Sequence, residues 1–254
     1  MSHVIECPSG LRGAIRGLKV KELNILADRR LAKSGRQFDQ ILAGCWLETI
    51  EHGPYVPGDQ SLDWSKVLQG DRFYAMLKIR AASLGPDYAF AVVCQNAACG
   101  HRFEWEVCLD ELPVKALSEE SRRRFQEGNR FETRLPGTGT RVWFRLAVGA
   151  DETRMAKHRQ AHQDALWSTM LALRVVEIEG VPESQKRRFL EELDVADAEH
   201  LRAAFDQVDC GVETTIELEC PECLGVQSVE LPFGPSFFLA PKPAPRKEAA
   251  CSHP

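Results

Sequence analysis

The sequence predicts an α+β fold, in which N-terminal helices stand beside a zinc-ribbon-like pair of β-hairpins. Three observations predict this fold class. Apolar residues recur with the helical period of about 3.6 residues as far as Gly85. The period then changes to 2, as in β-strands, over residues 87–108 and again over residues 212–231. Both alternating stretches are interrupted by two cysteines, so we expect the long segment between them to be a hairpin-and-helix insertion between two cysteine-bearing turns.

The N-terminal part of the chain has the apolar spacing of three helices. The first covers residues 20–35, and the second covers residues 37–50 with Cys45 on its buried stripe. The third helix covers residues 71–85, with Asp71 as its N-terminal cap. We expect Gly35 to end the first helix and Gly85-Pro86 to end the third.

The insertion has a less regular pattern. The sequence predicts, in order, a polar linker with a short helix (111–128), a hairpin around the turn "PGTGT" (130–150), a long helix from an Asp151 cap (150–178), a short helix from a Ser184 cap, and another after Asp194. The glycines of "PGTGT" lack the spacing of a phosphate-binding loop, which favours a plain turn. The expected division of the chain is therefore a helical region (1–90), a β module (91–110 with 210–240), an insertion (111–209) and a disordered tail (241–254).

Composition and charge exclude several function classes. No apolar run reaches the roughly 18 residues that a membrane helix needs, and the N-terminus lacks a secretion-signal pattern, so we expect no membrane partner. The net charge of -5 makes nucleic-acid binding an unfavourable interpretation. The basic runs at 122–124 and 186–188 are flanked by acidic residues, which indicates solvated mixed-charge faces.

The two cysteine-bearing turns predict a metal site. "CQNAACGHRFEWEV" (94–107) and "IELECPECLGVQSVEL" (216–231) share one order of elements: strand, two cysteines, glycine, strand. Two such turns side by side supply the four ligands of tetrahedral Zn²⁺. The predicted ligands of this structural zinc are Cys94, Cys99, Cys220 and Cys223. The first pair has four residues between its cysteines, which is looser than usual, so the alternatives are a former site that no longer binds metal and two hairpins with incidental thiols.

The remaining candidate ligands have simpler interpretations. Cys45, Cys108 and Cys210 are expected to be packing residues, while Cys7 has no partner at metal spacing. His101 is expected on the surface. His158 and His162 are four residues apart on a helix, but Arg159 stands where a metalloprotease has its glutamate, so solvent-facing histidines are favoured. Four thiolates also leave no open coordination position, and we therefore expect no enzyme activity and no small-molecule substrate.

Several segments taken together resemble a known family. They are "PSG" near the start, "WSKVLQGDRFYAMLKIRAASLGPDYAF" (64–90), the first cysteine turn with "FEWEV", and "CPEC" followed by "ELPFGPSFF". The chain resembles, over most of residues 4–240, the T-even-type baseplate assembly protein family of contractile-tailed phages. The resemblance implies a structural or chaperone-like protein of the baseplate hub, in a phage tail or a phage-tail-like injection system. Its partners would be baseplate or tail hub proteins, met in the host cytoplasm during assembly, with retention in the finished particle as an alternative.

Two further points stay open at the level of the sequence. Aromatic residues anchor interfaces well, so partner-facing surfaces are expected at five of them, with burial in the core as the alternative: Trp105, Trp143, Phe233, Phe237 and Phe238. The rival function is a zinc-ribbon nucleic-acid-binding or transcription-associated protein, with Arg102, Arg141 and Arg145 on one basic face.

Overall fold

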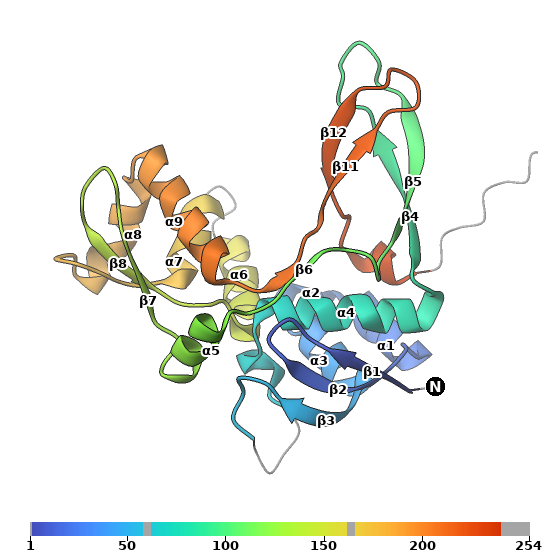
Figure 1. The fold of residues 1–254 in the computed structure, drawn as a ribbon, viewed down its shortest axis with the longest axis horizontal. Helices are drawn as coiled ribbons and strands as arrows, with labels where there is room; N and C mark the ends of the chain where they lie inside the picture. Colours follow the sequence, from blue (N-terminus) through green and yellow to red (C-terminus); the bar gives the residue numbers. More distant parts are fainter. Residues whose placement is uncertain (1, 58–61, 162–165, 240–254) are drawn as a thin grey trace, which may run out of the picture.

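The computed structural model describes residues 2–57, 62–161 and 166–239. The tail expected at 241–254 lies outside the described residues, as does His162. Figure 1 shows three parts: a body of helices and a small sheet, an arm of two hairpins that rises from it, and a lobe at the side. Within the described ranges, no helix combines the length and the apolar character needed to cross a membrane.

The body combines helices with a three-stranded antiparallel sheet in the order β1-β2-β3. Its elements are β1 (Ser2–Glu6), β2 (Leu11–Arg16), α1 (Val20–Ala27), α2 (Arg29–Ser34), α3 (Gln37–Cys45), β3 (Trp46–His52), the short 3-10 helix η1 (Trp64–Lys66) and α4 (Gln69–Leu84). Helix α4 is the central element: buried Ala75, Met76 and Ile79 belong to the same core as Leu11 and Ile15 of β2.

Three sequence predictions in the body are wrong. The helix expected at 20–35 is two helices, because the Asp28 carboxylate accepts hydrogen bonds from the backbone N–H groups of Arg30 and Leu31 and starts α2. Gly35 does end α2, in the left-handed conformation with φ of 69°. The helix expected at 37–50 ends at Cys45, because the next seven residues pair with β2 as strand β3. The expected helical region therefore contains a sheet.

Asp71 is the third correction. Helix α4 begins at Gln69, so Asp71 is not its cap and lies instead inside the first turn, facing the core. Its carboxylate is fully buried and accepts hydrogen bonds from Ser9 and Tyr55. Gly85 ends α4 as expected.

The arm consists of two antiparallel hairpins, as the sequence predicts. The first joins β4 (Asp87–Val93) to β5 (Arg102–Cys108), and the second joins β11 (Thr215–Glu219) to β12 (Val226–Glu230). Alternate residues of β4 are buried, namely Tyr88, Phe90 and Val92. At the base of the arm Tyr88 packs against Phe237 of the 3-10 helix η2 (Pro235–Phe238), with ring centroids 4.7 Å apart.

The lobe holds the segment between the two hairpins. Its elements are β6 (Val114–Lys115), α5 (Glu119–Gln126), β7 (Phe131–Arg134), β8 (Arg141–Phe144), α6 (Gly149–Ala161), α7 (Leu166–Arg174), β9 (Val175–Ile178), α8 (Glu183–Glu191), α9 (Val195–Val208) and β10 (Gly211–Val212). Strands β6 and β10 pair with each other where the chain enters and leaves the lobe, which brings the two halves of the arm together.

The lobe contains further differences from the sequence predictions. The long helix expected at 150–178 is wrong at its end, because Val175–Ile178 form strand β9 beside β8. Asp151 is not the residue before α6 but lies inside its first turn, where its carboxylate accepts the N–H of Val148. Helix α8 begins one residue before the expected Ser184 cap, whereas Asp194 does precede α9.

Candidate metal centre

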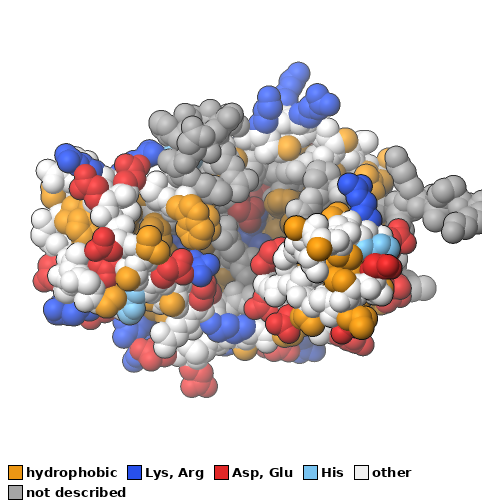
Figure 2. All heavy atoms as spheres, turned by 90° about the horizontal axis from the view of Figure 1, so that it is seen from above, with side chains coloured by type: hydrophobic (Ala, Val, Ile, Leu, Met, Phe, Trp, Pro, Cys, Tyr) orange, Lys and Arg blue, Asp and Glu red, His pale blue; other side chains and the backbone are white. Residues whose placement is uncertain are grey.

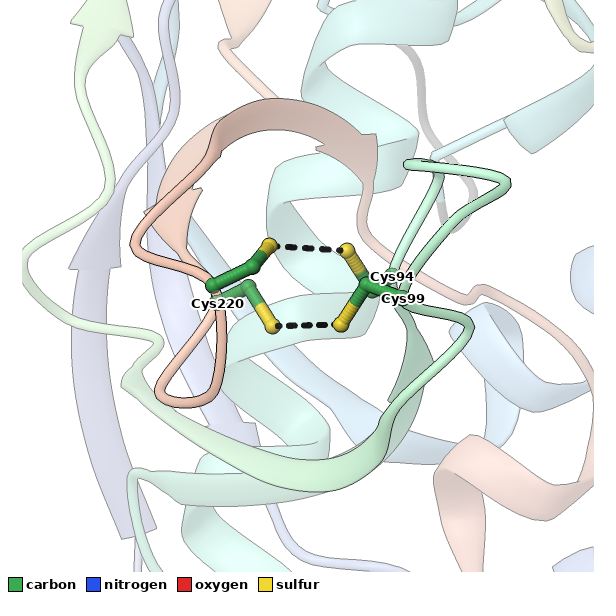
Figure 3. A group of neighbouring side chains, drawn as sticks. Cys94, Cys99 and Cys220 are labelled. Atoms are coloured by element: carbon green, nitrogen blue, oxygen red, sulfur yellow. Dashed lines mark hydrogen bonds between the residues drawn. The ribbon is translucent and has the colours of Figure 1, made fainter.

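The four predicted cysteines lie together at the end of the arm. Their sulfur atoms are all within 4.8 Å of one another, and they are the one such group of three or more His, Cys, Asp or Glu residues in the described part of the chain. Each close sulfur pair joins the two hairpins: Cys94 to Cys223 at 3.6 Å and Cys99 to Cys220 at 3.9 Å (Figure 3). A disulfide bond is about 2.05 Å long, so these are four separate thiols.

The sulfur separations fit a tetrahedral metal ion. Four ligands at the Zn–S distance of about 2.3 Å lie at the corners of a tetrahedron with edges of about 3.8 Å. Two of the six separations, 3.6 and 3.9 Å, bracket that edge, and the others are within 4.8 Å. The looser spacing of the first cysteine pair therefore does not keep its sulfurs from the positions that a metal needs.

The two turns share features of backbone geometry although their cysteine pairs differ in spacing. In the first turn Cys94 N–H donates to the carbonyl of His101, and Gly100 after the second cysteine has a φ of 59°. In the second turn Cys220 N–H donates to the carbonyl of Gly225, and Leu224 has a φ of 57°. Gly225 follows one residue later than the equivalent Gly100, so Leu224 itself adopts the left-handed backbone.

The pKa values of two of the thiols, Cys220 and Cys94, are shifted in opposite directions. Backbone N–H groups of Cys223 and Glu222 stabilise the Cys220 thiolate and lower its pKa to about 7, against the opposing effect of burial. The backbone N–H of Asn96 acts in the same direction on Cys94, but burial and the neighbouring thiols outweigh it and raise the pKa of Cys94 to about 12. Thiols this close cannot all ionise by themselves, whereas a cation among them stabilises every thiolate.

Two amide side chains, Gln227 and Asn96, support the site, and the sequence pattern does not predict either of them. Gln227 is buried and accepts a hydrogen bond from Gln95 N–H at 2.8 Å, while its own amide donates to the Val93 carbonyl at 3.3 Å. Asn96 lies 3.9 Å from the Cys223 sulfur. These contacts tie the two turns together around the sulfurs. Nothing in the pattern of alternating residues distinguishes Gln227 from an exposed strand residue.

The other cysteines and the histidines lie elsewhere. Cys45 is fully buried, as predicted, and burial raises its pKa to about 11. Cys7 is also buried, while Cys108 and Cys210 are half-buried. His158 is not solvent-facing as expected: it is half-buried and its ring lies 3.0 Å from the Thr169 hydroxyl. His101 is half-buried beside the ring of Phe103.

The expected partner-facing aromatics are divided between core and surface. Phe237 and Phe238 are buried, which makes a partner-facing role wrong for these two. Phe233 packs on Phe73 with ring centroids 4.7 Å apart, so it too belongs to the intramolecular packing. Trp105 and Trp143 are half-buried.

The three arginines of the rival nucleic-acid interpretation do not share an element or a sheet. Arg102 lies on β5 of the arm, whereas Arg141 lies on β8 of the lobe and stacks near Trp143. Arg145 forms an ion pair with Asp151 in the same lobe. A single basic face made of these three residues is therefore not present.

Two hairpins that bring four thiols together above a mixed helical and sheet body define the chain as an α+β protein with a four-cysteine cluster. The sequence model of the family described as T4 bacteriophage base plate protein matches residues 35–239, which is most of the chain. The chain therefore belongs to this family, as its sequence motifs indicate, and to the structural proteins of the phage tail. Searches among curated proteins and among solved structures found no match.

Proposed function

We propose that the chain is a structural or assembly protein of the baseplate hub, in a contractile phage tail or a phage-tail-like injection system. It acts through contacts with other baseplate or hub proteins, during assembly in the host cytoplasm and, if retained, in the finished particle. Family membership supports the baseplate setting. The four converging sulfurs support a scaffold function, because closed thiolate sites hold structural metal.

In this proposal Cys94, Cys99, Cys220 and Cys223 bind one structural Zn²⁺. Residues 91–110 and 210–240 then form one zinc-ribbon-like module, and residues 111–209 are an insertion within it. The metal clamps the ends of two hairpins, whose turns are also joined by amide hydrogen bonds of Gln95 and Gln227. Gross metal-binding energies of about 10–16 kcal/mol for small zinc modules are large enough to fix such an arm.

The test combines metal analysis with assembly. The purified wild-type protein is expected to carry one zinc per chain, and Cys220→Ser is expected to lose it. Cys108→Ser is the matched control, because Cys108 lies outside the cluster and should leave the zinc content unchanged. In a phage or injection system that lacks the gene, the wild-type chain should restore baseplates and Cys220→Ser should restore fewer.

Two results would contradict different parts of the proposal. A wild-type protein without stoichiometric metal would refute the zinc clamp and leave the baseplate function standing. Normal baseplates in the absence of the gene would refute the baseplate function, whatever the metal content.

A further inference from the structure

The arm carries a concentration of unpaired negative charge. Residues 87–108 contain three acidic residues and residues 213–230 contain five, with Arg102 as the one Lys or Arg residue in both hairpins. All eight acidic side chains are exposed, and none belongs to an ion pair found among the described residues. Elsewhere on the molecule acidic side chains commonly face basic ones, for example Glu192 with Arg188. Any basic surface that complements these carboxylates therefore lies outside the two hairpins.

The end of the arm adds an apolar component. Val93, Leu224 and Val226 are 51%, 66% and 70% exposed. Figure 2 looks down on this end and shows apolar side chains with Asp and Glu side chains along part of its edge, and with a basic and a His side chain beside them. Leu224 also holds the left-handed backbone at which its counterpart in the first turn is a glycine. An exposed leucine in a strained conformation lowers the stability of the chain without adding core packing, and its side chain is available for contact with a partner.

The segment of α1 and α2 has the opposite character. Residues 19–36 contain six basic and two acidic residues. The six basic side chains are all exposed. Of the two acids, Glu22 is buried and pairs with Arg16 and, at 3.6 Å, with Lys21, and Asp28 accepts the first N–H groups of α2. Val20, between Lys19 and Lys21, is 73% exposed and adds an apolar contact to this basic surface.

The arm and the basic surface of one chain do not meet. Figure 1 shows that the arm rises on one side of α4, and that its end points away from α1 and α2. The two surfaces can combine only between different chains. A contact between unlike surfaces of identical chains is heterologous, and repetition of it closes a ring where the rotation allows.

We propose that the acidic, apolar-tipped arm of one copy docks on the α1–α2 surface of a second copy, head to tail. The observations that carry this inference are the matched charge and apolar content of the two surfaces and their separation within one chain. The proposal names a second copy of this chain as a partner of the scaffold, and it rests on the proposed baseplate function for its setting. Exposed ion pairs contribute little each, so the contact is weak in dilute solution and sensitive to salt.

Charge reversal provides the test. The wild-type protein, 28.5 kDa as a monomer, is expected to associate at low ionic strength and to dissociate at high ionic strength in sedimentation velocity. Glu217→Lys/Glu219→Lys on the arm should weaken association by about 10-fold or more, and Arg29→Glu/Arg30→Glu should do the same. An equimolar mixture of the two variants should regain association, because each then offers the charge that the other needs. Glu119→Lys/Glu120→Lys in α5 is the control for the arm variant. It changes the net charge by the same amount away from both surfaces and should leave association unaltered.

Three results would overturn the proposal. They are a wild-type monomer at low ionic strength, arm and surface variants that associate like the wild type, and a mixture that fails to regain association. A monomeric protein that still restores baseplates would overturn the second copy as partner and leave the proposed function standing.

Discussion

Asp71 shows what the sequence pattern misses at the scale of single residues. An aspartate near the start of a helix is typical of a cap, yet this carboxylate is fully buried and burial raises its pKa. Its partners, Ser9 and Tyr55, are 62 and 16 residues away in the chain. By contrast, the convergence of Cys94, Cys99, Cys220 and Cys223 could be predicted, because each pair is local in sequence and lies in a recognisable turn. Contacts set by tertiary packing leave no such local signal.

Tyr55→Phe is expected to destabilise the fold. The Tyr55 hydroxyl donates to Asp71 at 2.6 Å and accepts the N–H of Leu68 at 3.1 Å, so its loss leaves two buried polar groups short of a partner. We expect the free energy of unfolding to fall by about 2 kcal/mol in urea denaturation. Tyr74→Phe is the control, because Tyr74 is half-buried and the ring that faces Lys78 is retained. Equal losses in the two variants would contradict the role given to the Tyr55 hydroxyl.

Glu22 predicts a dependence of stability on pH. Its carboxylate is buried, but ion pairing with Arg16 and the N–H of Lys19 overcome that burial and lower its pKa from 4.5 to about 2. Because the pKa is lower in the folded state, the stabilisation is complete above pH 4.5 and disappears as the pH falls toward 2. Glu22→Gln should therefore cost about 2 kcal/mol of unfolding free energy at neutral pH and progressively less below pH 4.5. A difference that does not change with pH would refute this origin of the stabilisation.

At the scale of elements, both arm hairpins could be predicted, as could the helix ends at Gly35 and Gly85, whereas two other helix ends could not. The helices expected at 37–50 and 150–178 both continue in sequence into strands, β3 and β9. Each of these strands exists because a partner strand from elsewhere in the chain satisfies its backbone, β2 for the first and β8 for the second. Apolar spacing over one window contains no information about that partner. The β4–β5 and β11–β12 hairpins could be predicted, because in each of them the two strands that pair are neighbours in sequence across a short turn.

Leu224→Gly is expected to stabilise the arm. A leucine with φ of 57° has a steric cost that glycine avoids, and Leu224 buries little surface because it is 66% exposed. We expect thermal unfolding of the metal-loaded protein to show a gain of about 0.5–1 kcal/mol. Gly100→Ala, at φ of 59° in the other turn, should show a loss of similar size. A destabilised Leu224→Gly protein would mean that the leucine side chain contributes packing that its exposure hides.

At the scale of the whole molecule, the lobe is an insertion in sequence between the two hairpins of the arm. Cys99 and Cys220 are separated by 121 positions in sequence, and the first hairpin is complete long before the second begins. Strands β6 and β10 pair where the chain enters and leaves the lobe, while the four sulfurs lie together at the far end of the arm. The arm is thus fixed at two levels, by apolar packing of Tyr88 and Phe237 below and by the proposed metal above.

This arrangement predicts that removal of the metal loosens the end of the arm and leaves the rest of the molecule folded. After chelation, the amides of Cys94, Gly100 and Leu224, which are hydrogen-bonded within the turns, should exchange with solvent about 10-fold faster or more. The amides of α4 should keep their protection, because buried Met76, Leu77 and Ile79 lie in the core of the body, far from the sulfurs. Hydrogen exchange followed by mass spectrometry measures both sets in one experiment.

Cys220→Ser should exchange like the chelated protein without any chelator, and Cys108→Ser like the untreated wild type. Loss of protection in α4 together with the arm would show that the metal supports the whole fold, and unchanged exchange in both turns would show that amide hydrogen bonds alone hold the hairpins together.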